Sequence, residues 1–194
     1  YIQTKNLMPT GIDYEKKPAW VDPHSHNDPQ RSRLQVDDLL FGNAGVASIG
    51  RTVVVTKLPD PVNISQDIDL IRFEGISPHY VGVFLKCHFG RLQIERLSSG
   101  VGAPKITFAK IKSIKIPVIP ENVQTHIEKK YREMAEVHDE AMRAKEALIA
   151  RGVTNAVAEK DPIYREKIQQ AEELLHQLVQ RTIEVVEGKR KDVV

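Results

Sequence analysis

The sequence predicts an α+β protein, in which a mixed α/β region over residues 1–120 precedes a long two-helix antiparallel coiled-coil hairpin over residues 121–194. Glycines, prolines and short β-branched runs punctuate the first region, whereas apolar residues recur at helical spacing after Pro120. The chain has 194 residues, 41% of them hydrophobic, which suffices for one domain with a core and an appendage.

Runs of β-branched residues predict the strands of the first region, at residues 52–56, 68–73 and 111–116. The glycines between residues 45 and 50 predict a tight turn ahead of the strand 52–56. From Pro78 to about Leu97, apolar residues at three- and four-residue spacing predict a helix, in which Gly90 allows a break. A glycine-rich loop at residues 98–104 then leads into a basic, alternating strand.

Two helices are predicted after Pro120, over residues 123–149 and 162–187. Gly152 can end the first, and Asp161 is a suitable N-cap for the second because Pro162 follows at the first helical position. Apolar residues at alternating spacings of four and three form a heptad seam on the second helix. The apolar face of this helix is wider than one seam, so it should contact more than its hairpin partner; the widening residues are Leu174, Val179, Ile183 and Val186.

Composition limits the classes of protein to which the chain can belong. A single cysteine, Cys87, excludes an internal disulfide and a cysteine-rich zinc site, which favours a reducing, cytoplasmic setting. No apolar run approaches the roughly 20 residues that a membrane-spanning helix needs, so no membrane partner is expected. Because the sequence starts at Tyr1 without an initiator methionine, we expect a piece cut from a longer chain.

Positive charge is concentrated in the first region, although the net charge is only +2. Residues 1–120 hold 15 lysines and arginines against 11 aspartates and glutamates, while residues 121–194 hold 13 against 15. Residues 91–120 contain six basic residues and one acidic residue, Glu95. This block is the best electrostatic candidate for a nucleic-acid surface, and the alternative interpretation is an ordinary solvated basic strand.

Fragments that resemble catalytic motifs are incomplete. Residues 45–52 nearly match the phosphate-binding loop G-x-x-x-x-G-K-[ST], but Arg51 replaces the lysine, and a strand follows where a helix should begin. Ser98 and Ser99 lack a nucleophile elbow or an identifiable base. Two histidines and two aspartates lie within residues 22–28, but zinc needs three or four converging ligands. We therefore expect no catalytic residue, metal or cofactor.

Several elements of the first region occur in a characteristic order. An aspartate and an apolar strand lead through a small-residue turn to Gly-Arg at residues 38–51, and residues 65–67, 78–80, 93–96, 100–107 and 114–117 follow. In this order the elements resemble the target recognition domain of type I restriction-modification specificity subunits, and residues 1–7 resemble the first strand of that domain. The resemblance covers about residues 1–135, and the later helices are similar to the family's spacer helices. One departure is Asn43, where such turns often carry a basic residue.

The resemblance implies that the chain reads a short sequence of double-stranded DNA and is not itself an enzyme. Adenine methyltransferase subunits and a restriction and translocase subunit would supply the chemistry. Base contacts are expected from Asn43, Ser48, Gln66 and Lys105. Backbone contacts are expected from Arg31, Arg33, Arg51, Lys86, Arg91, Lys110 and Lys112. With one recognition domain, the chain should pair with a second copy or a second recognition half through helices 123–149 and 162–187.

Two alternatives remain open. The chain could be the C-terminal recognition segment of a fused adenine-specific methyltransferase whose catalytic domain precedes Tyr1, and a methyl-donor-binding loop with an Asn-Pro-Pro-Tyr motif upstream would decide this. It could also be a protein-interaction module that acts through its helical arm. DNA affinity that falls steeply with added salt would distinguish recognition of DNA from the second alternative.

Overall fold

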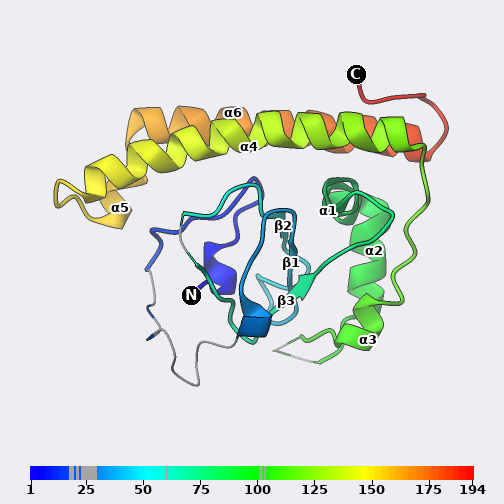
Figure 1. Cartoon of the computed structure of the whole chain (residues 1–194), viewed down its shortest axis with the longest axis horizontal. Helices are drawn as coiled ribbons and strands as arrows, with labels where there is room; N and C mark the ends of the chain where they lie inside the picture. Colours follow the sequence, from blue (N-terminus) through cyan, green and yellow to red (C-terminus); the bar gives the residue numbers. More distant parts are fainter. Residues whose placement is uncertain (18–19, 21, 23–29, 60, 101, 103) are drawn as a thin grey trace.

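The computed structural model describes residues 1–17, 20, 22, 30–59, 61–100, 102 and 104–194. A small antiparallel sheet in the order β2-β1-β3 forms the centre of the first region (Figure 1). Its strands are β1 (Leu39–Gly42), β2 (Thr52–Val54) and β3 (Ile68–Ile71). The structure therefore confirms the expected α+β class and the strands predicted around residues 52–56 and 68–73.

Each face of the central strand β1 packs against a different hydrophobic cluster. Leu39 and Phe41 contact the cluster that contains the helices, whereas Leu40 contacts a second cluster with Ile2 and Leu7 from the chain's beginning. Side chains alternate across a strand, so burial on both faces explains why every residue of β1 is buried. β1 thus connects the N-terminal segment to the helical layer.

The helices follow the sheet in chain order: α1 (Pro78–Lys86), α2 (His88–Leu97), α3 (Phe108–Ile111), α4 (Glu121–Ile149), α5 (Asn155–Ala158) and α6 (Pro162–Val186). Two short 3-10 helices, η1 (Thr4–Asn6) and η2 (Gln30–Ser32), precede the sheet in the described part of the chain. The predicted cap is confirmed, because Asp161 Oδ1 accepts hydrogen bonds from the N–H groups of Ile163 at 2.9 Å and Tyr164 at 3.1 Å. In the described part of the chain, no helix combines the length and apolarity needed to cross a bilayer.

Helices α4 and α6 lie side by side and run in opposite directions above the sheet (Figure 1). Their inner faces share a core with α1, to which Ile127 and Tyr131 of α4 and Leu175 and Leu178 of α6 contribute. The residues that widen the apolar face of α6 are half-buried, and Leu174, Val179 and Val186 pack against this core. The prediction that the second helix contacts more than its hairpin partner is confirmed, and α1 is the additional contact.

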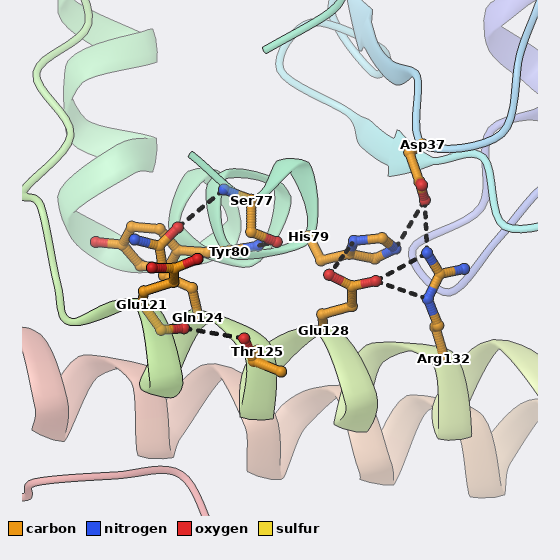
Figure 2. Close-up of polar contacts among 9 residues, drawn as sticks. All are labelled: Asp37, Ser77, His79, Tyr80, Glu121, Gln124, Thr125, Glu128 and Arg132. Carbon is orange, nitrogen blue, oxygen red and sulfur yellow. Dashed lines mark hydrogen bonds and ion pairs between the residues drawn. The ribbon is translucent and has the colours of Figure 1, made fainter. Parts of the chain in front are cut away.

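Polar contacts hold α4 against the start of α1 and the turn before β1 (Figure 2). The Ser77 N–H donates to Gln124 Oε1 at 2.8 Å. The Arg132 guanidinium lies 2.7 Å from Asp37 Oδ1 and 2.9 Å from Glu128 Oε1. These contacts connect the first region to α4 beyond Pro120, and the hydrophobic core also continues across that residue.

His79 is buried beside these ion pairs. Its Nε2 lies 3.6 Å from Asp37 Oδ1 and its Nδ1 lies 3.8 Å from Glu128 Oε2, both beyond hydrogen-bond distance (Figure 2). Burial is the main cause that lowers the pKa of His79, and the Arg132 guanidinium lowers it further. The ring is therefore neutral at pH 7 and packs edge-on against Tyr131, with centroids 5.2 Å apart.

Three sequence-based predictions of local structure are wrong. Residues 1–7 contain η1 and isolated bridges from Ile2 to Ile64 and from Leu7 to Ile12, rather than a strand. The helix predicted from Pro78 breaks at Cys87, whose backbone is extended, and not at Gly90.

The third wrong prediction is the strand at residues 111–116. The short helix α3 occupies Phe108–Ile111 and a turn follows it. Gln93 explains why this backbone needs no neighbouring strand, because its side chain accepts from Lys115 N at 2.8 Å and donates to Lys115 O at 2.9 Å. Both polar groups of one peptide segment are thereby satisfied by a helix side chain.

Replacing Tyr131 with phenylalanine is expected to lower the free energy of unfolding by about 1–2 kcal/mol. The fully buried Tyr131 hydroxyl accepts from Val54 N at 3.1 Å, so it satisfies a donor at the edge of the sheet. Tyr164→Phe is the matched control, since the Tyr164 hydroxyl has no hydrogen-bond partner in the described part of the chain. Urea unfolding that gives equal losses for both variants would contradict this role.

Candidate nucleic-acid interface

Three of the predicted base-contacting residues, Asn43, Gln66 and Lys105, meet where β1 ends. The Asn43 N–H donates to Asp67 O at 2.9 Å, and Asn43 Nδ2 donates to Gln66 O at 3.3 Å. On the other side, Asn43 O accepts from Ile106 N at 3.0 Å, and Ala44 pairs with Lys105 in an isolated bridge. We call Asn43, Gln66 and Lys105 the strand-end cluster.

The members of the strand-end cluster differ in exposure. Asn43 is only 6% exposed and its amide holds the 66–67 turn, so its side chain has a structural role. The side chains of Gln66 and Lys105 are exposed. Burial raises the pKa of the neighbouring Asp69 carboxyl, while Asn43 and Lys105 act in the opposite direction. Gln66 and Lys105 are therefore the members available to a ligand.

Glycine-rich turns support both sides of this cluster. Gly45 and Gly50 have φ values of +92° and +74°, and Gly45 O accepts from Ser48 N at 3.1 Å, so the predicted tight turn is confirmed. Ser48 is half-buried within this turn. In the second turn, Ser99 and Lys105 exchange backbone hydrogen bonds of 3.1 and 2.8 Å. Both turns fix the backbone beside the exposed side chains.

Three of the predicted backbone-contacting residues line one cavity of about 530 Å³. We call it the basic pocket; its cations are Lys5, Lys16, Arg51, Lys86 and Arg91. The walls are the N-terminal segment, the 50–52 turn, the ends of α1 and α2 that meet at Cys87, and α6. Lys5 and Lys16 are not distinguished by any motif in the sequence, because only the path of residues 1–17 brings them to the pocket.

Backbone carbonyls position the cations of the basic pocket. Arg51 Nη1 donates to Leu7 O at 3.3 Å, and Arg91 Nη1 donates to Gly50 O at 3.3 Å. Lys86 Nζ donates to Thr52 O and, at 3.3 Å, to Thr52 Oγ1. Burial, reinforced by Arg91, lowers the pKa of Lys86 to about 7. Lys86 therefore titrates near neutral pH.

Lys5 connects the basic pocket to the strand-end cluster. It also lines a second hollow of about 300 Å³, together with Gln66 and Asp67. The exposed amide of Gln66 and the cations around Arg51 consequently border two hollows that share Lys5 as a lining residue. A hydrogen-bonding side chain thus lies beside concentrated positive charge.

In the described part of the chain, Arg33, Lys110 and Lys112 line neither of the two hollows. Lys110 Nζ donates to Ser99 Oγ at 3.3 Å, and Lys112 Nζ lies 4.9 Å from the centre of the half-exposed Phe108 ring. Arg33 lies near the opposite end of β1, because its carbonyl accepts from Arg72, which pairs with Asp38 at 2.6 Å. Arg31 belongs to η2.

Residues 23–29, which carried most of the metal-site interpretation, lie outside the described residues. Among the residues that the structure describes, no group of three or more histidine, cysteine, aspartate or glutamate side chains could hold a metal ion. Neither the models of known protein families nor the curated protein sequences include a match to this chain.

Proposed function

We propose that this chain recognises double-stranded DNA as a specificity subunit, or half-subunit, of a type I restriction-modification system. The observation that carries the proposal is the position of exposed Gln66 beside the basic pocket, with Lys5 lining both hollows. DNA recognition needs amide or basic side chains for base edges and further cations for phosphates. The ordered family resemblance of residues 1–135 supports the same conclusion.

In this proposal, the first region is the target recognition domain and reads half of a bipartite site. Helices α4 and α6 form the antiparallel coiled-coil spacer and set the distance to a second recognition half, supplied by a second copy or another chain. Adenine methyltransferase and restriction subunits join this assembly in the cytoplasm. On the arm, Val157 and Ile163 are 57% and 60% exposed near α5, and they offer apolar surface to a partner.

Gln66 and Arg51 should affect DNA binding in different ways. Gln66→Ala is expected to reduce the preference for the recognised sequence about tenfold, because a base-edge contact is lost. Arg51→Gln is expected to weaken binding to all sequences alike and to lower the salt slope by about one, because a phosphate contact is lost. Lys129→Gln, on the exposed face of α4, is the control. The measurement is fluorescence anisotropy over a salt series.

The recognised DNA sequence can be identified by co-expressing the full-length protein that contains this chain with its methyltransferase subunit. Modified adenines are then mapped across a genome. A bipartite motif supports the specificity-subunit role. Salt-insensitive or absent DNA binding, together with no modified motif, would instead favour a protein-interaction module. A methyl-donor loop and an Asn-Pro-Pro-Tyr motif upstream of Tyr1 would identify a fused methyltransferase.

A further inference from the structure

The basic pocket contains more positive charge than the surrounding protein neutralises. Among the described residues, none of its five cations lies within 4.0 Å of a carboxylate oxygen, and Glu172 is the acid that lines it. The Arg91 guanidinium also disfavours the charged form of Lys86. Like charges gathered in a partly desolvated cavity are unfavourable unless an anion binds among them.

Part of the lining of the basic pocket, which we call its apolar wall, consists of apolar residues. Leu7, Met8 and Pro9 of the N-terminal segment and Leu175 and Val179 of α6 form it. The volume of about 530 Å³ lies within the range of small-molecule sites, roughly 300–1,000 Å³, and exceeds what a lone phosphate fills. A suitable ligand therefore has an anionic group and a less polar body.

We propose that the basic pocket binds a phosphate ester of mononucleotide size, either as a free mononucleotide or as one nucleotide unit of a DNA strand. Arg51 and Arg91 each use one nitrogen on a backbone carbonyl, which leaves the rest of their fork for phosphate oxygens. The base or sugar packs against the apolar wall. This site does not depend on sequence reading by Gln66 and Lys105, so it can exist even if the chain reads no DNA sequence.

Binding of the phosphate is coupled to protonation of Lys86. The other ionisable groups that line the pocket are Lys5, Lys16, Arg51, Arg91, Glu172 and His176. Without ligand, the pKa of Lys86 is about 7, so the Lys86 amine is mostly neutral at pH 8. A dianionic phosphate favours the charged amine and raises its pKa. Formation of the complex at pH 8 therefore transfers a proton from the buffer to the Lys86 amine. This uptake becomes smaller towards pH 6, because Lys86 is already charged in the free protein.

Isothermal titration calorimetry with AMP and with inorganic phosphate tests the site on the 194-residue chain. At pH 8, AMP is expected to bind at least about tenfold more tightly than inorganic phosphate, because only AMP can contact the apolar wall. Heats measured in buffers of different ionisation enthalpy should reveal uptake of up to one proton per AMP. Lys86→Met should weaken AMP binding about tenfold and abolish the uptake, whereas Lys129→Met should change neither.

Two further experiments identify the source of the phosphate ester and provide a second pocket variant. Competition between a DNA duplex and AMP supports a nucleotide unit of DNA, and AMP binding unaffected by DNA supports a free mononucleotide. Arg91→Gln, at an exposed position, repeats the test if Lys86→Met does not fold by circular dichroism. Absence of AMP binding at 10 mM, or equal AMP affinity in the wild-type protein and the folded pocket variants, would overturn the proposal. Loss of sequence-specific DNA binding alone would leave the phosphate-site proposal standing and would count only against the proposed function.

Discussion

Replacing Lys145 with methionine is expected to lower the free energy of unfolding by about 3–5 kcal/mol. The Lys145 side chain is fully buried, and its Nζ lies 2.6 Å from Asp13 Oδ2 and 3.0 Å from Glu159 Oε1. Asp13 is only 2% exposed, so methionine at position 145 would leave a buried carboxylate without its cation. Urea unfolding at pH 7, followed by circular dichroism, measures the loss.

Matched variants separate the buried pair from the exposed one. Glu159→Gln should lower the free energy of unfolding by less than about 1 kcal/mol, because the Glu159 side chain is 37% exposed and water screens the interaction. The double variant Asp13→Asn with Lys145→Met should recover much of the loss, since no buried charge then lacks a partner. Equal losses for Lys145→Met and Glu159→Gln would show that the Asp13 pair is unimportant.

The ion pair between Lys145 and Asp13 also affects the basic pocket. The N-terminal segment reaches α4 through Asp13 and through Thr10 Oγ1, which lies 2.9 Å from His138 Nδ1. This segment also carries Lys5 and the apolar wall of the basic pocket. Partial release of the segment in Lys145→Met should therefore weaken AMP binding as well as stability, although Lys145 does not line the pocket.

Elements determined by local chemistry could be predicted from the sequence. Asp161 and Pro162 determine the start of α6 within a few residues, and short runs rich in β-branched residues indicate β2 and β3. The failures arise where a distant side chain decides the outcome. Residues 111–116 look like a strand, but the Gln93 amide satisfies the Lys115 backbone. Local sequence contains no information about that contact.

The apolar face of α6 shows a second kind of limit. Its excess width predicts a contact beyond the hairpin partner, and the expected pairing with a second copy through the helices would have been one way to provide it. In the structure, α1 lies against α6, and Cys87 Sγ at the end of α1 is 3.7 Å from Val179 O. Periodicity reveals how wide an apolar face is, but it does not identify which surface covers it. Pairing with a second copy remains a proposal that rests on other surfaces.

The candidate site could be anticipated only by residue type. Arg51, Lys86 and Arg91 are predicted phosphate contacts, and they line one pocket although the first and the last are 40 positions apart in the sequence. Asn43 was selected as a base contact, but its burial and its bond to Gln66 O give it a structural role. Lys5 and Lys16 could not be selected, because the path of the N-terminal segment brings them to the pocket.

Gly90→Ala is expected to lower the free energy of unfolding by about 2 kcal/mol. A Cβ atom on Gly90 would lie 2.5 Å from Phe84 O and 2.6 Å from Leu85 Cα, so it would clash with the backbone of α1. Backbone atoms cannot rotate away, and α2 would have to shift relative to α1. Alanine's better helix propensity, worth about 1 kcal/mol, offsets only part of this loss. Chemical denaturation measures the net change.

Gly82→Ala within α1 is the control for this prediction. A Cβ atom there would meet Val54 Cγ2 at 3.0 Å and Leu39 Cδ1 at 3.1 Å, and these side-chain ends can move. Its stability should therefore stay within about 1 kcal/mol of the wild type. A shift of α2 in Gly90→Ala should also displace Arg91 from Gly50 O and weaken AMP binding, although every pocket cation is retained. If both variants keep wild-type stability and AMP affinity, the close approach of α1 and α2 does not position Arg91.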